Sequence, residues 1–242
     1  MAYIPNFISE EEQKNILDKA RSIPFAPHKI KENRYLANEI QKLPPQQIPS
    51  NQWINLAHRR LQPLPSRLTN TNTLLTSTAL PSWLQTPLIE RISALEIFSN
   101  APHGINHCLI NEYLPGQGIM PHEDGAAYYP AVATVSLGGT LVLDVIEKGE
   151  KKRSWRILQE PRSLLVTTGE AYTETLHGIA EVEEDRELGS ETVANWGLLG
   201  GEKSRIEECG GVNVRTTRIS LTFRDVKKVS ALGKKIFGKP KT

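Results

Sequence analysis

The chain has 242 residues, 38% of them hydrophobic, and a formal net charge of +2. A chain of this length can bury a full core, and single-domain β-sandwiches and barrels fall in the same size range. We therefore expect a single domain over residues 1–242. The near-balanced charge excludes an overall polyanion-binding signature, although a local basic patch is compatible with nucleic-acid binding.

The cellular setting is predicted from three absences in the sequence. Two cysteines, Cys108 and Cys209, are too few for a disulfide framework. No apolar run approaches the roughly 20 residues of a membrane-spanning helix. Residues 1–6 lack the basic stretch and apolar core of a secretory signal. We expect an intracellular protein of the cytoplasm and nucleus that has no membrane association.

Two helices are predicted in the N-terminal half. Ser9 followed by Glu12 forms a capping box, and apolar side chains then recur at helical spacing, which predicts a helix over 9–22. Four leucine and isoleucine side chains on one face predict a second amphipathic helix over 81–96. Between them, residues 25–80 are rich in Pro, Gln, Asn, Ser and Thr, which predicts a partly irregular region.

The rest of the chain has the pattern of a β fold. Short β-branched segments, separated by Gly, Pro or charged turns, occur at 105–113, 131–137, 140–146, 154–158, 163–168 and 216–224. This layout predicts an α+β, mainly β fold in which the N-terminal helices pack on a double-stranded β-helix (jelly-roll) core. Residues 181–213 are acidic and contain several glycines, which predicts a mobile surface loop between two core strands.

His122, Asp124 and His177 are candidate metal ligands. Side chains two residues apart in extended backbone share a face, so His122 and Asp124 can point at one cavity, and a neighbouring strand could bring His177 there. Taken alone, such residues are more often a solvated loop and a hydrogen-bonded core histidine. Two imidazoles and one carboxylate are the ligand set of catalytic iron(II), whereas structural zinc needs four protein ligands. Iron(II) with open positions for O2 and a cosubstrate fits the pattern better.

Candidate cosubstrate ligands lie on two predicted strands. Residues 218–224 alternate strictly, so Arg218 and Arg224 share one face. Such a face can be exposed to solvent; inside a barrel it requires an anion, and Arg suits the carboxylates of a dicarboxylic keto acid. The two arginines stand roughly 20 Å apart on an ideal strand, which makes Arg218 the stronger candidate for direct binding. Asn111 and Tyr113 share another strand face and could add hydrogen bonds.

Together these residues resemble the AlkB family of iron(II)- and 2-oxoglutarate-dependent dioxygenases. The resemblance rests on residues 111–113, 115–125 and 177–179 and on the pair of arginines in 218–224, in the order and spacing of the family. It implies a jelly-roll fold and oxidative demethylation of a methylated RNA or DNA. Fe(II) would be bound at the site, and 2-oxoglutarate and O2 would be consumed there. The iron would be bound by His122, Asp124 and His177, and 2-oxoglutarate by Asn111, Tyr113, Arg218 and Arg224.

One feature departs from the family pattern. Members that repair bases usually offer an aromatic residue from the N-terminal region to stack on a flipped base, and residues 60–65 contain none. Trp53 or Tyr128 could take that role, although a lone aromatic is more often part of the packing.

Three functions are compatible with the resemblance. A nucleic-acid demethylase would bind RNA or single-stranded DNA through basic side chains, for which the candidates are Lys148, Lys151, Lys152, Arg153, Lys227, Lys228, Lys234, Lys235, Lys239 and Lys241. A second hypothesis keeps the enzyme but changes the target to a protein side chain or a small molecule. The third is a nucleic-acid-binding module with little catalysis.

Overall fold

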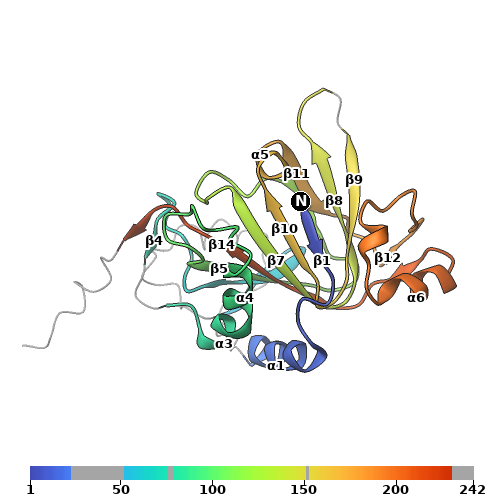
Figure 1. Cartoon of the computed structure of the whole chain (residues 1–242), viewed down its shortest axis with the longest axis horizontal. Helices are drawn as coiled ribbons and strands as arrows, with labels where there is room; N and C mark the ends of the chain where they lie inside the picture. The colour runs from blue at the N-terminus through green and yellow to red at the C-terminus, as the bar shows by residue number, and fades with distance from the viewer. Residues whose placement is uncertain (23–51, 76–78, 151–152, 231–242) are drawn as a thin grey trace, which may run out of the picture.

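A computed structural model describes residues 1–22, 52–75, 79–150 and 153–230, which include all seven predicted site residues (Figure 1). Two antiparallel sheets form its centre. The larger has the strand order β1 (Ala2–Ile4), β10 (Leu164–Thr168), β7 (Ala131–Gly138), β14 (Arg218–Arg224), β5 (His107–Tyr113), β3 (Arg59–Leu64) and β2 (Ile54–Leu56). The smaller has the order β6 (Ile119–His122), β11 (Thr175–Ile179), β8 (Leu141–Glu147) and β9 (Ser154–Gln159). This is the predicted mainly β jelly-roll core.

The larger sheet buries both of its faces. On one face Ile219, Leu221 and Phe223 of β14 join a cluster with apolar side chains of the N-terminal helices. The other face turns toward the smaller sheet, where Tyr113 and Leu165 pack against apolar side chains of β8, β9 and β11. Because β14 alternates, its arginines lie on the face between the sheets, which excludes the solvent-exposed alternative.

The strand predictions agree with the structure to within two residues at each end for all six segments. Shorter strands were missed. No strand was predicted between residues 25 and 80, and the structure places β2, β3 and β4 (Leu74–Leu75) there, with β4 paired to β15 (Val229–Ser230). β3 carries polar side chains on both faces, so its pattern has no period of two, and its pairing with β5 buries it instead.

The first predicted helix is confirmed as α1 (Glu10–Arg21), with Ser9 and Glu12 forming the capping box. The predicted continuous helix over 81–96 is wrong. The chain instead forms α3 (Ser82–Leu84), a π-helical segment η2 (Gln85–Ile89) and α4 (Glu90–Ser93), with Thr86 in an extended conformation. Proline disfavours helical backbone in the residue before it, and Pro87 follows Thr86.

The helices α1, α3 and α4 lie together on one side of the sheets, where they cover the larger sheet (Figure 1). Arg91 of α4 pairs with Glu12 of α1, at 2.7 Å. None of the helices in the described residues is long and apolar enough to cross a membrane.

Residues 181–213 form a folded insertion on the outer face of the smaller sheet. They contain β12 (Glu184–Asp185), η3 (Trp196–Leu198) and α6 (Glu202–Glu208), and β13 (Asn213–Val214) begins at their last residue. Trp196 and Ile206 are buried against Val142 and Leu158 of the sheet. Because the segment is mostly acidic, its sequence did not indicate that these two apolar side chains pack on the sheet. The mobility predicted for the segment stays a prediction.

Candidate metal and cosubstrate site

The pairing of β6 with β11 brings the two candidate histidines together. His177 is directly opposite His122 in this pair, and their ring centroids are 4.4 Å apart. The close approach depends on Gly178, because a Cβ at this position would lie 2.9 Å from the backbone nitrogen of Pro121. The strand pairing thus supplies the proximity that 54 residues of intervening sequence could not show.

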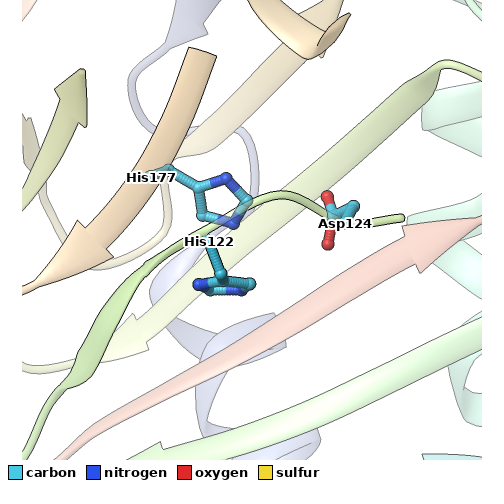
Figure 2. A group of neighbouring side chains, drawn as sticks. All are labelled: His122, Asp124 and His177. Atoms are coloured by element: carbon cyan, nitrogen blue, oxygen red, sulfur yellow. The ribbon is translucent and has the colours of Figure 1, made fainter. Parts of the chain in front are cut away.

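Asp124 completes a cluster with both histidines. One potential ligand atom from each residue lies within 4.8 Å of the others. Figure 2 shows His122 and Asp124 leaving neighbouring positions of one segment, while His177 reaches them from β11. The Nδ1 atom of His122 lies 2.9 Å from the carbonyl oxygen of Met120. A proton on Nδ1 would be donated there, which leaves the Nε2 lone pair for a metal.

The charge state of the cluster suits a divalent cation. Burial lowers the pKa of His177 to about 4, so its imidazole is neutral at physiological pH. Burial acts to raise the pKa of Asp124, but the Arg224 guanidinium and the two histidines together outweigh it and lower that pKa, so the carboxylate is ionised. Neutral imidazoles and one carboxylate are the donor set expected for iron(II).

Arg224 is the direct partner of Asp124. The two side chains form an ion pair and are only 7% and 6% exposed. An arginine in this position neutralises part of the carboxylate charge and restricts its rotation. The structure therefore places Arg224 on the metal ligand, at the opposite end of β14 from Arg218.

Arg218 is a buried cation that lacks a carboxylate partner among the described residues. Its Nη2 group donates to two neutral acceptors, and its Nε atom has no hydrogen-bond partner within the part of the chain that is described. Burial lowers its pKa to about 10, so the guanidinium is still charged at neutral pH. A buried charge of this kind requires an anion, and one carboxylate of 2-oxoglutarate fits that requirement.

Tyr113 lies beside Arg218, and Asn111 lies opposite Ser220, two residues further along β14. β5 pairs with β14 so that Tyr113 is opposite Arg218, whose guanidinium carbon is 6.0 Å from the phenol ring centroid. Asn111 accepts a hydrogen bond from Arg59 Nε at 3.3 Å. Since Arg can only donate, the amide nitrogen of Asn111 is free to donate toward the cosubstrate.

The two candidate stacking residues have different surroundings. Trp53 is 2% exposed, in the apolar cluster under the helices, with the Arg60 guanidinium 4.4 Å from its ring centroid. It is part of the core and has no ring face free for a base. Tyr128 instead lies next to the metal cluster, 4.9 Å from the guanidinium carbon of Arg224.

Tyr172 is a second aromatic neighbour of the cluster, and the sequence interpretation missed it. Its hydroxyl donates to the carbonyl oxygen of Gly125 at 3.3 Å. Burial and then the Asp124 carboxylate raise its pKa to about 12. Its position five residues before His177 was the only sequence signal for this contact.

Two of the candidate phosphate contacts in the described residues form ion pairs with acidic side chains. Lys148 Nζ lies 2.5 Å from Glu123, the residue between His122 and Asp124, and Arg153 lies 2.7 Å from Glu147. Lys227 and Lys228 are exposed. The others lie outside the described residues: Lys151, Lys152, Lys234, Lys235, Lys239 and Lys241.

Comparison with known proteins agrees with this geometry. The model of the 2OG-Fe(II) oxygenase superfamily matches residues 1–224. A Danio rerio protein named probable RNA/DNA demethylase ALKBH6 is 34% identical over 238 residues, which cover 94% of this chain and 86% of that protein. The chain belongs to the AlkB family. It is therefore an Fe(II)- and 2-oxoglutarate-dependent dioxygenase.

Other members are similar over less of their sequence or only in fold. The alkbh8 protein of Xenopus tropicalis, a tRNA (carboxymethyluridine(34)-5-O)-methyltransferase by name, is 34% identical over 128 residues, 52% of this chain and 19% of its own length. The solved structure of OsALKBH1 matches 92% of this AlkB-family chain and 96% of its own, with a TM-score of 0.53 and 17% identity. Residues 160–166 and 176–178 resemble the sixth human AlkB homologue, in agreement with the Danio rerio relative.

Proposed function

We propose that this dioxygenase removes a methyl group from a base of RNA or single-stranded DNA by oxidising the methyl carbon. The observation that carries the proposal is the position of Tyr128, an aromatic ring next to Asp124 and Arg224. A base taken out of its stack needs such a ring beside the reacting centre. The name of the Danio rerio relative, probable RNA/DNA demethylase, supports the same substrate class.

The residues of the chain would hold the reactants in place. Iron and 2-oxoglutarate together supply the oxidation, in which O2 converts 2-oxoglutarate to succinate and carbon dioxide and hydroxylates the methyl carbon. A hydroxylated N-methyl group then leaves as formaldehyde. His122, Asp124 and His177 would hold the metal, and Arg218 would anchor the far carboxylate of the cosubstrate.

Tyr128 would orient the substrate base. Stacking of a base on an aromatic side chain contributes about 1–3 kcal/mol, so Tyr128→Ala is expected to raise the KM for a methylated oligonucleotide about 10-fold or more. Tyr128→Phe keeps the ring and should behave like the wild type. Both variants should form succinate from 2-oxoglutarate without substrate at the wild-type rate, which separates loss of stacking from loss of iron.

The direct test is mass spectrometry of nucleosides after aerobic incubation with Fe(II) and 2-oxoglutarate. Mixed methylated RNA and single-stranded DNA serve as substrates, and Asp124→Ala serves as the inactive control because it lacks the carboxylate of the His122–Asp124–His177 cluster. Loss of one methylated nucleoside in the wild type alone would identify the mark. No loss, with succinate still formed, would contradict a nucleic-acid substrate.

A protein side chain or a small molecule is the second candidate substrate. It is favoured by the ion pairs of Lys148 and Arg153 with glutamates, which leave these two cations less available to phosphates. Binding of a nucleic acid weakens steeply with salt because counterions are released from phosphates. Turnover that is insensitive to salt would support this second candidate.

A further inference from the structure

Arg218 is held by two neutral side chains that have no assigned role. Its Nη2 group donates to Ser136 Oγ at 2.9 Å and to Gln159 Oε1 at 2.6 Å. The Ser136 hydroxyl in turn donates to Gln159 Oε1 at 3.0 Å. The three residues are 2%, 0% and 1% exposed, in the order Arg218, Ser136, Gln159. This closed network fixes one end of the guanidinium inside the protein.

The three members come from both sheets. Ser136 lies on β7, which neighbours β14 in the larger sheet, and Gln159 is the last residue of β9 in the smaller sheet. The network therefore crosses the space between the sheets. A longer or shorter side chain at Gln159 would move the guanidinium relative to the metal cluster at the other end of β14.

The neutrality of both partners has an electrostatic consequence. A carboxylate at either position would compensate the charge of Arg218, as Glu112 does for Arg60 and Asp185 does for Arg215. With an amide and a hydroxyl instead, no carboxylate of the described residues compensates the charge, and within the same residues the Nε hydrogen is left for another acceptor.

We propose that Gln159 and Ser136 are positioning residues that make the enzyme select a 2-oxo acid with a carboxylate at its far end. They fix the guanidinium through Nη2 and, being neutral, reserve its charge for the cosubstrate. The inference rests on the cofactor class of the family and is independent of the methylated substrate.

Gln159→Glu separates this role from simple packing. Glutamate has nearly the same shape and can accept the same hydrogen bonds, so Arg218 stays in place, but the new carboxylate neutralises its charge. Gln159→Leu removes the acceptor and keeps the volume. If Gln159 were only a packing residue, the Glu variant would bind the cosubstrate like the wild type. The Leu variant would then be less stable but would have an unchanged affinity for the cosubstrate.

The test is isothermal titration calorimetry on the full chain loaded with Mn(II), which holds the cosubstrate without turnover. Two five-carbon acids are compared, 2-oxoglutarate and 2-oxovalerate, which differ only in the far carboxylate. We expect Gln159→Glu to weaken 2-oxoglutarate binding about 100-fold and to leave the Kd of 2-oxovalerate within about 2-fold. Gln159→Leu should weaken 2-oxoglutarate about 10-fold. Gln85→Glu, an exposed position, is the control for added charge.

Two results would overturn the inference. One is an unchanged Kd of 2-oxoglutarate in Gln159→Glu; the other is equal weakening of both acids, which would indicate general damage to the site. Should Gln159→Glu fail to fold, Ser136→Ala provides the same comparison. In that variant we expect a several-fold weaker binding of 2-oxoglutarate with 2-oxovalerate unaffected, and an equal effect on both acids contradicts the proposal.

Discussion

At the scale of single residues, the two arginines of β14 divide the site between them. Arg224 pairs with the metal ligand Asp124, whereas Arg218 is a buried charge with neutral partners. Arg218→Ala should therefore raise the KM for 2-oxoglutarate about 100-fold, because a charge-assisted pair is lost, with little effect on metal affinity. Succinate formation at varied 2-oxoglutarate measures the first effect, and Mn(II) binding measures the second.

The controls for this prediction use the other arginines. Arg153→Ala removes an exposed guanidinium and should leave both quantities unchanged. Arg224→Ala should weaken metal binding, because Asp124 loses the partner that restricts its rotation. A KM for 2-oxoglutarate that does not change in Arg218→Ala would mean that the carboxylate binds elsewhere.

A second residue-scale prediction concerns Gly178, whose missing Cβ lets β6 approach β11. In Gly178→Ala the new methyl group would meet backbone of Pro121 and push His122 away from His177. We expect Mn(II) affinity to fall at least about 10-fold, since metal ligation depends on ligand distance to a few tenths of an ångström. The matched control is Gly189→Ala, where no atom lies within 4 Å of the added Cβ. Equal affinities in the two variants would contradict the prediction.

Strand alternation in the sequence identified these site residues, but it predicted only part of how they are arranged in space. Spacing of two placed His122 with Asp124, and alternation in residues 218–224 placed both arginines on one face, but only the structure shows that this face lies between the sheets. The sequence could not show that Arg224 pairs with Asp124 across 100 positions, or that Gln159 of the other sheet reaches Arg218. Such contacts depend on sheet topology, which a periodic pattern does not encode.

At the scale of elements, the helices and strands that were predicted correctly are those with the longer and more regular sequence patterns. The six short β-branched segments bounded by turns were found, as was α1 with its capping box. The helix over 81–96 failed because Pro87 forces Thr86 into extended backbone, although the apolar spacing suits a helix. β2 and β3 were missed because neither has a period of two: β3 is partly buried by pairing with β5, and β2 forms the edge of the sheet by pairing with β3.

The insertion between β11 and β14 gives an element-scale prediction. Trp196 is 6% exposed and packs in a cluster with Val142 and Leu158 of the smaller sheet. Trp196→Ala should lower the free energy of unfolding by about 3–5 kcal/mol, the usual loss for a large buried aromatic. Urea denaturation followed by circular dichroism measures it. Leu198→Ala in the same turn removes an exposed side chain and should cost less than about 0.5 kcal/mol.

An insertion that is docked only loosely would give a different result. The two variants would then have nearly equal free energies of unfolding, and limited proteolysis would cleave residues 181–213 in the native protein. The ion pair of Arg215 with Asp185, 2.5 Å long and 3% exposed on both sides, is a second anchor of this segment. A docked insertion with two anchors is therefore expected to resist cleavage until the sheets unfold.

At the scale of the whole molecule, the two sheets, the helices and the insertion share continuous apolar clusters. The helix-side cluster and the cluster between the sheets lie on opposite faces of the same strands, so neither can form without the larger sheet. We therefore expect the part of the chain that the structure describes to unfold as one cooperative unit, with calorimetric and van't Hoff enthalpies that agree. Two separate heat-absorption peaks would contradict a single domain.

The position of the site between both sheets makes this unit responsive to its ligands. His122 and His177 belong to the smaller sheet and Arg218 to the larger, so a metal with 2-oxoglutarate bound at these residues would contact both. Ligands at about 100 times their Kd stabilise the native state by about 2.7 kcal/mol, which corresponds to a rise of about 5–10 °C in Tm for a chain of this size. Scanning calorimetry with Mn(II) and 2-oxoglutarate should show the whole transition moving by this amount, whereas Asp124→Ala should not respond because its metal site lacks the carboxylate. A shift of only part of the transition would mean that the two sheets unfold independently and that the site bridges them without coupling them.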